Sequence, residues 1–116
     1  MLDAFGQGMY SLDIERVLRV LTEDALVIGS EVGELGFGHD AIRTFIKRVM
    51  DRYGPIKWEW DLVEIRGAGD HAWFFVEGNV SYSGELSPYR ASGVCRRDDV
   101  GEWKLAMFHG STPDGD

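Results

Sequence analysis

Residues 57–113 read KWEWDLVEIRGAGDHAWFFVEGNVSYSGELSPYRASGVCRRDDVGEWKLAMFHGSTP, with apolar and polar side chains alternating over most of the stretch. A period of two is typical of a β-strand that buries one face. Turn signals rich in glycine or aspartate interrupt the pattern at 67–70, 83–84 and 98–101. The stretch therefore predicts a meander of long antiparallel strands, at about Lys57–Arg66, His71–Ser83, Pro88–Arg97 and Glu102–Ser111.

The first half of the chain has a helical period instead. Apolar residues recur at helical spacing over 14–21 and again over 41–53, and Gly54-Pro55 would end the second helix. Between the two, Ala25–Ile28 and Glu34–Phe37 are expected to form a small hairpin. Helices followed by a long curved sheet predict an α+β fold in which helices cover one face of the sheet.

Composition indicates one globular domain over residues 1–116, with a tail from about 112 that is expected to fray. Twenty acidic and twelve basic side chains give a formal charge of −8, which opposes binding to a phosphate backbone. We therefore expect no nucleic-acid partner. No apolar run approaches the roughly 20 residues that span a bilayer, and the first residues show no charged-then-apolar signal pattern, so we expect no membrane partner and a cytoplasmic location.

The single cysteine, Cys95, lies in an alternating apolar run, where packing in the core is expected rather than a reactive thiol. The three histidines, His39, His71 and His109, are far apart and show no metal-ligand spacing. Neither of the glycine-rich phosphate-binding motifs is present. The sequence gives no indication of a metal or any other cofactor.

Loop lengths allow the register of the strands to be estimated. With loops at 67–70, 83–84 and 98–101, a row of Trp60, Glu77, Arg90 and His109 would share one face of the sheet. We expect this face to form a ligand pocket, because it mixes large aromatic side chains with a few polar groups. The further pocket-lining residues would be Trp58, Phe75, Asn79, Ser92, Met107 and Ser111. The opposite face would suit close packing or a dimer contact, and it would carry Val63, Phe74, Val76, Ala91, Gly93, Ala106 and Phe108.

The three ionisable residues of that row are candidate catalytic residues. A buried Arg90 would remain charged and Glu77 would be its counter-ion. His109 could then exchange a proton near neutral pH while Arg90 holds an anionic oxygen. In the alternative interpretation, the three residues satisfy one another and only fix the strand register.

Three segments, taken in order, resemble the SnoaL-like branch of the nuclear transport factor 2-like superfamily. They are Leu21-Thr22-Glu23-Asp24-Ala25 leading to Gly29-Ser30, then Gly38-His39-Asp40-Ala41-Ile42-Arg43-Thr44-Phe45, and Arg96-Arg97-Asp98 with the run from Trp103 to Pro113. The resemblance implies a cone-shaped α+β barrel, a hydrophobic pocket between the curved sheet and the helices, and a homodimer through the outer sheet face. The ending Phe108-His109-Gly110-Ser111-Thr112-Pro113 also resembles that of the calcium/calmodulin-dependent kinase II association domain, whose arginine-lined pocket favours an inward Arg90.

Two departures from the family qualify this resemblance. Steroid isomerases of the superfamily carry an aspartate base on the first strand, whereas Leu26-Val27-Ile28 is apolar here. Relatives also begin with a long helix over the cone, of which almost nothing is expected because only Met1 to Phe5 precede Gly6. Either the start of the chain is late or a partner chain closes the pocket.

Two functions remain open on this basis. One is cofactor-independent acid/base catalysis on a small apolar carbonyl compound or epoxide, as an isomerase, cyclase, dehydratase or hydrolase. The other is a non-catalytic ligand-binding or dimerisation module.

Overall fold

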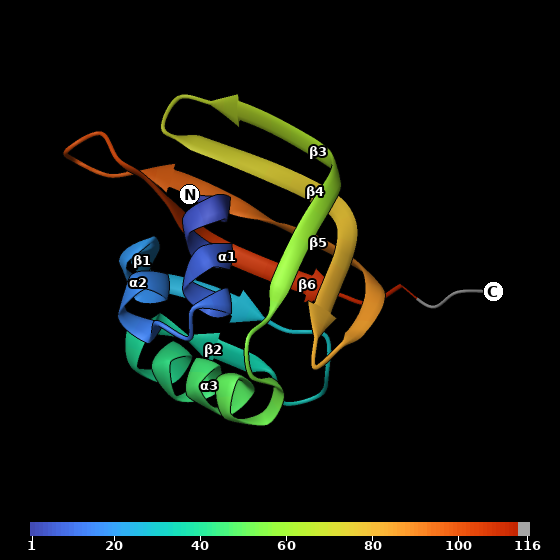
Figure 1. The fold of residues 1–116 in the computed structure, drawn as a ribbon. Helices are drawn as coiled ribbons and strands as arrows, with labels where there is room; N and C mark the ends of the chain where they lie inside the picture. The colour runs from blue at the N-terminus through green and yellow to red at the C-terminus, as the bar shows by residue number, and fades with distance from the viewer. Residues whose placement is uncertain (114–116) are drawn as a thin grey trace.

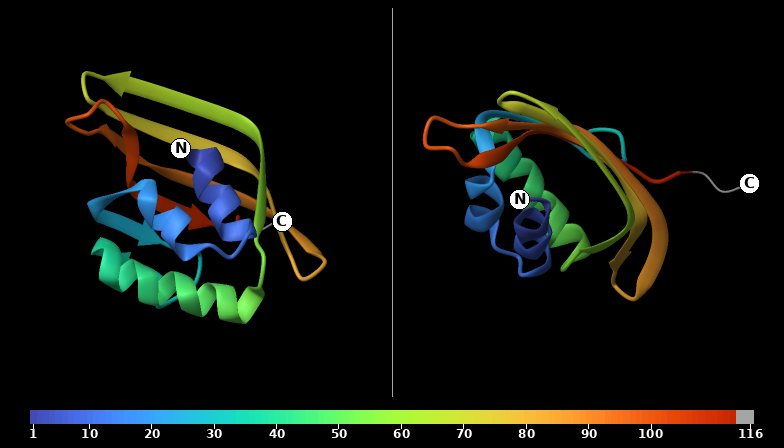
Figure 2. Two further views of the ribbon diagram at one scale, coloured as in Figure 1. Left: turned by 60° about the vertical axis from the view of Figure 1, so that its left-hand side comes forward. Right: turned by 90° about the horizontal axis from the view of Figure 1, so that it is seen from above.

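The computed structural model describes residues 1–113, which form a curved six-stranded sheet with three helices against its concave face (Figures 1 and 2). The helices are α1 (Leu2–Tyr10), α2 (Ile14–Arg19) and α3 (Gly38–Tyr53). The strands are β1 (Leu21–Ile28), β2 (Leu35–Phe37), β3 (Lys57–Ala68), β4 (His71–Tyr82), β5 (Glu85–Arg97) and β6 (Trp103–Ser111). The α+β fold with helices on one sheet face is confirmed. Asp114, Gly115 and Asp116, most of the tail expected to fray, lie outside the described residues.

The strands are arranged in the order β2-β1-β6-β5-β4-β3. The predicted meander makes up β3 to β6, and the predicted small hairpin is β1 with β2. These two parts are joined by parallel pairing of β1 with β6, in which Val27 lies opposite Phe108. The sheet is not closed, so its strong curvature alone creates the hollow that holds the helices (Figure 2).

Helices α2 and α3 form where the helical period predicted them. Asp13 caps α2 by accepting a hydrogen bond of 3.1 Å from the amide of Arg16. Helix α3 buries Ile42, Phe45, Ile46 and Met50 against the sheet and ends at Gly54, whose φ of 69° favours glycine. Within the described residues, no helix is both long enough and apolar enough to cross a membrane.

Helix α1 corrects the expectation that almost nothing of the first helix is present. It has nine residues and continues through Gly6 and Gly8, which had suggested that no helix could extend past Phe5. Gly8 has a packing role, because a Cβ there would lie 2.7 Å from Cγ2 of Val17 on α2. The glycine that weakens the helix by propensity is thus the one that lets α1 and α2 lie close together.

In β4, β5 and β6 the faces of the sheet are the reverse of the sequence prediction. Phe74, Val76, Ala91 and Phe108 belong to the buried core on the concave side, and so does Cys95, which is 2% exposed. These apolar residues had been assigned to the face away from the pocket. The charged row lies on the convex face, where water solvates it without the cost of burying ions.

The register explains part of this reversal. Strands β4 and β5 pair as predicted, with Glu77 opposite Arg90. In contrast, β3 turns into β4 through only two residues, so that Leu62 lies opposite Glu77. A bulge between Trp60 and Leu62 then places Trp60 opposite Gly78. Because the side-chain period of a strand is two, the residue added by the bulge places Trp60 on the concave face and Glu77 on the convex face.

A second irregularity lies between β5 and β6, at Val94 and Cys95. Together with a turn of five residues between β5 and β6, one more than assumed, it places His109 opposite Ser92, whereas Arg90 lies opposite Ser111. His109 and Arg90 therefore share the convex face but are not directly paired. The predicted row is thus broken at both of its ends, and only the Glu77 and Arg90 pair is present.

Gly78 is opposite the β3 bulge, and its lack of a side chain makes that bulge possible. A Cβ at this position would collide with the carbonyl oxygen of Glu59. We predict that Gly78→Ala lowers the free energy of unfolding by about 1–3 kcal/mol, because backbone atoms would have to move apart. Urea denaturation followed by tryptophan fluorescence measures the change.

Gly67→Ala is the matched control within the same pair of strands. A Cβ there would meet the nearest atom at 3.4 Å, which is an ordinary contact. If both variants were equally stable, the close approach of β3 and β4 at the bulge would be contradicted.

Candidate functional site

A cavity of about 400 Å³ lies between the helices and the concave face of the sheet. It is at the end of the molecule where the C-terminal end of α3, the loop after β1 and the hairpin of β4 and β5 come together (Figure 1). Aromatic side chains from α1, α3 and four strands make up much of its wall. They are Phe5, Phe45, Tyr53, Trp58, Tyr82, Tyr89 and Phe108.

The floor of the cavity is a cluster of aromatic rings around Trp58. Its ring centroid lies 5.7 Å from that of Phe5, 5.8 Å from that of Phe108 and 5.9 Å from that of Tyr89. The Trp58 ring thereby joins α1, β3, β5 and β6. Its indole Nε1 is buried and has no hydrogen-bond partner within residues 1–113, which leaves a donor available in an apolar wall.

Tyr53 holds the mouth of the cavity in place. Its hydroxyl donates a hydrogen bond of 3.3 Å to Oε2 of Glu31, and its ring meets that of Tyr82 edge-on at 4.9 Å. Its carbonyl oxygen accepts a hydrogen bond of 3.3 Å from the hydroxyl of Ser83 in the β4/β5 hairpin. Burial raises the pKa of the Tyr53 hydroxyl, and the charge of Glu31 raises it further. Tyr53 therefore links α3, the loop after β1 and the β4/β5 hairpin at the mouth of the cavity.

Two carboxylates and a tyrosine supply the main polar groups of the cavity. Glu34 is half-buried, and its Oε1 accepts a hydrogen bond of 3.1 Å from the amide of Glu31. Tyr89 is 7% exposed and lies against Gly110, where a Cβ would collide with the phenol. Burial raises the pKa of Tyr89, and the charge of Glu34 adds to this effect. Tyr89 is thus a neutral hydroxyl at physiological pH, close to a carboxylate.

The structure does not bring the predicted catalytic residues to this cavity. Glu77 and Arg90 form an ion pair of 3.3 Å on the convex face, with each side chain almost half exposed. His109 is exposed on the same face, one row away. No described contact joins the three to the cavity, so their predicted inward position is corrected.

The predicted pocket-lining residues divide between the two faces. Trp58 lies in the wall of the cavity. Trp60 lies on the concave side, stacked on Trp58 at 6.2 Å, and lines a smaller hollow of about 220 Å³ between α1 and β3. The others do not line the cavity, because they project from the convex face of β4, β5 and β6. They are Phe75, Asn79, Ser92, Met107 and Ser111.

Sequence reasoning missed Glu34 and Tyr89. Tyr89 alternates with Arg90, so placing the charged side chains toward water would have placed Tyr89 inside. Glu34 had been assigned to a short strand, but it precedes β2 and its backbone pairs with Gly29 by a hydrogen bond of 2.7 Å. No period identifies a cavity residue in such a loop.

The curved sheet over three helices, with a cavity at its concave face, defines the nuclear transport factor 2-like class of α+β proteins. Within this class, the chain belongs to the SnoaL-like domain family, whose profile matches residues 1–115. No curated protein sequence matches the chain at a significant level.

Solved structures of the same fold are similar over nearly the whole chain. A nuclear transport factor 2-like protein of unknown function from Pseudomonas putida KT2440 is 19% identical, with a TM-score of 0.84 over 98% of this chain and 82% of that one. A ketosteroid isomerase-like protein from Erwinia carotovora atroseptica SCRI1043 is 21% identical, with a TM-score of 0.77 over 98% of this chain and 92% of that one. Nuclear transport factor 2 from Cryptosporidium parvum is 10% identical, with a TM-score of 0.82 over 97% of this chain and 88% of that one. At these identities the likeness concerns the fold alone.

The raised pKa of Tyr89 predicts how stability changes at high pH. The folded state holds the neutral phenol, so this group contributes its full stabilisation below its unfolded pKa of about 10 and loses it as the pH rises further. We expect the free energy of unfolding to fall more steeply above about pH 10 in the wild type than in Tyr89→Phe. Urea denaturation of both proteins between about pH 8 and 11 measures the difference. If the free energy of unfolding depended on pH in the same way in both proteins, the Tyr89 hydroxyl would not be desolvated in the folded state.

Proposed function

We propose that this protein binds a small, largely apolar molecule in the cavity between α1, α3 and the concave sheet face. The observation that carries the proposal is a space of about 400 Å³ whose aromatic and aliphatic walls are interspersed with hydroxyl and carboxylate groups. Its volume lies within the roughly 300–1,000 Å³ of known small-molecule sites, which share this composition. A bound molecule would be oriented by the hydroxyl of Tyr89 and the carboxylate of Glu34.

A second candidate is acid/base catalysis in the same cavity without a cofactor. Glu34 and Tyr89 favour it, because a carboxylate can remove a proton from a bound carbonyl compound while a neutral phenol donates a hydrogen bond to the oxygen that becomes negative. The ketosteroid isomerase-like name of one similar structure agrees with this chemistry. Glu77, Arg90 and His109 have no part in it, since they lie across the sheet. A non-catalytic binding protein is the alternative, and it requires the same cavity.

Turnover separates the two candidates. If the cavity catalyses, Glu34→Gln is expected to lower kcat by about a hundredfold or more while apolar ligands still bind. Turnover of a small ketone or epoxide followed by mass spectrometry is the measurement. Activity that survives in Glu34→Gln would remove Glu34 as the base.

Filling the cavity tests the binding proposal itself. Val49 is half-buried on α3 and lines the cavity. We predict that Val49→Phe lowers the affinity for small apolar ligands at least tenfold, because the added ring occupies part of their space. Calorimetric titration with 3-tert-butylphenol and related alkylphenols measures the affinity.

Val100→Phe is the matched control for this variant. Val100 is 81% exposed in the turn between β5 and β6, at the opposite end of the sheet from the cavity. Equal affinity of Val49→Phe, Val100→Phe and the wild type would contradict binding in this cavity.

For the quaternary state, we propose a homodimer through the convex face of the sheet. Leu62, Trp73 and Phe75 expose apolar area there, with Trp73 half exposed. The adjacent Glu77 and Arg90 give the same face both charges, which two copies related by a twofold axis can match. An exposed aromatic patch with paired charges at its edge is typical of such an interface.

The dimer proposal predicts a change of mass on one substitution. Trp73→Glu places a charge in the patch and is expected to shift the protein from about twice the monomer mass to the monomer mass of 13.0 kDa. Size-exclusion chromatography with light scattering measures it, and Val100→Glu is the control with the same charge change. A wild type that is monomeric at tens of micromolar would overturn the proposal.

A further inference from the structure

We propose that the cavity selects organic cations, such as apolar amines and quaternary ammonium compounds, over neutral and anionic molecules of the same shape. The inference rests on the proposed binding function and adds to it the charge of the ligand. It follows from three features of the cavity. Its charged side chains are all negative, one of these carboxylates has no ion-pair partner, and aromatic rings line the cavity wall.

The ionisable side chains are the first feature. Among the described residues that line the cavity, the carboxylates are Glu31 and Glu34, and there is no lysine, arginine or histidine. The residues outside the described part, Asp114, Gly115 and Asp116, include no cationic side chain either. Arg48 and Arg52 do not line the cavity; they line an adjoining depression of about 210 Å³ beside α3, whose wall also includes Glu31 and Glu34. An anion in the cavity would therefore lose water without meeting a positive charge.

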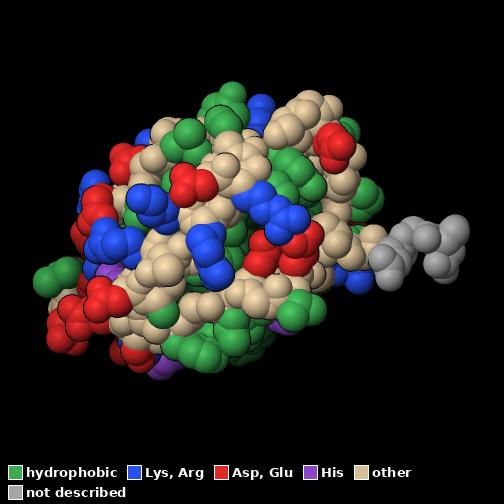
Figure 3. Space-filling model, turned by 90° about the horizontal axis from the view of Figure 1, so that it is seen from below, with side chains coloured by type: hydrophobic (Ala, Val, Ile, Leu, Met, Phe, Trp, Pro, Cys, Tyr) green, Lys and Arg blue, Asp and Glu red, His purple; other side chains and the backbone are tan. Residues whose placement is uncertain are grey.

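The two carboxylates differ in their partners. Glu31 is exposed. Its carboxylate accepts a hydrogen bond from the Tyr53 hydroxyl and lies 3.5 Å from the guanidinium of Arg52. Glu34 has no ion pair within residues 1–113, and its side chain packs over Gly29, where a Cβ would lie only 2.7 Å from its own Cβ. Figure 3 shows acidic and basic side chains mixed over the face of the molecule that is seen from below. Glu34 is thus a fixed negative charge that a ligand can neutralise.

The third feature is the arrangement of the aromatic rings. Tyr53 and Tyr82 meet at 4.9 Å and 67° at the mouth, while Trp58 and Tyr89 are 5.9 Å apart in the wall. The faces of such rings carry negative potential, and a desolvated cation over them is favoured by about 2 kcal/mol or more, which is roughly thirtyfold in affinity. The raised pKa of Tyr89, to which Glu34 contributes, agrees with a negative potential inside the cavity.

An isosteric pair of probes isolates the charge. (3-Hydroxyphenyl)trimethylammonium and 3-tert-butylphenol have the same shape and differ only by nitrogen for carbon at one centre. Calorimetric titration of the wild type is expected to give at least tenfold tighter binding of the cation. The anionic probe 3-hydroxybenzenesulfonate is expected to bind weakest.

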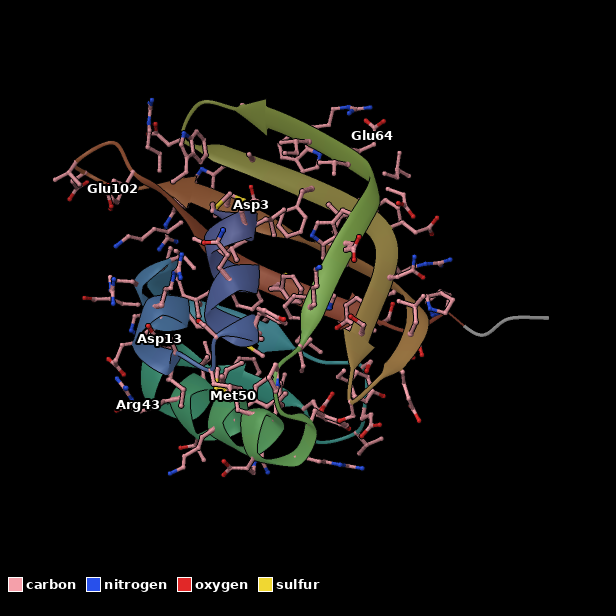
Figure 4. All side chains as sticks on the ribbon, in the orientation of Figure 1. Asp3, Asp13, Arg43, Met50, Glu64 and Glu102 are labelled. Atoms are coloured by element: carbon pink, nitrogen blue, oxygen red, sulfur yellow. The ribbon has the colours of Figure 1, made fainter. Side chains whose placement is uncertain are left out.

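Glu34→Gln keeps the side-chain oxygen that accepts the Glu31 amide and removes the charge. We expect the substitution to lower the affinity for the cation about five- to tenfold. The affinity for 3-tert-butylphenol should stay within about twofold of the wild-type value. The control is Glu102→Gln, the same change in an exposed residue at the far hairpin, labelled in Figure 4. That variant should bind both probes like the wild type, because the overall charge of the protein is not what selects the cation.

The outcomes separate this inference from the proposed function. Equal affinity for both probes, or equal weakening of both in Glu34→Gln, would overturn the selection of cations while leaving the cavity as a binding site. Binding of neither probe nor any alkylphenol would overturn the binding function as well. If Glu34→Gln did not fold, the wild type alone would decide. Its cation affinity should fall between about 0.05 and 0.5 M salt while that of 3-tert-butylphenol does not, and parallel behaviour would contradict the inference.

Discussion

The packing of the Trp58 ring is the interaction on which the rest of the site depends. It touches Phe5 of α1, Tyr89 of β5 and Phe108 of β6, and so it connects the first helix to the middle of the sheet. Phe5 also packs directly on Phe108, with ring centroids 4.9 Å apart, so that the three rings hold α1 over the hollow together. The floor of the cavity and the placement of the first helix therefore have the same origin.

Trp58 can occupy that position because β3 is bulged. The bulge after Trp60 lets the first part of the strand present its tryptophans to the concave face, while Leu62 faces outward beside Glu77. Gly78 supplies the space that the bulge needs. A local irregularity of one residue thus decides which side chains line the cavity.

The sequence was sufficient for the fold and for most elements, because periods of two and 3.6 are properties of many residues at once. It was not sufficient for the site, because register depends on single residues in turns and bulges. The two-residue turn, in place of the assumed loop at 67–70, moved the partner of Glu77 from Trp60 to Leu62, and the bulge then placed Trp60 opposite Gly78. The desolvation cost of ions was the better guide: it places Glu77 and Arg90 toward water and Tyr89 inside. Trp58 was predicted from an estimated register that differs from the observed one, in which it lies opposite Val80, whereas Glu34 follows no pattern.

A structure of the complex with an apolar ligand tests the central claim most directly, because it distinguishes the two faces of the sheet. For crystals soaked with 3-tert-butylphenol, we expect electron density for the ligand between Trp58, Tyr89 and Val49, with its hydroxyl toward Tyr89. Ligand bound instead against Glu77, Arg90 and His109, with the cavity unchanged, would contradict it.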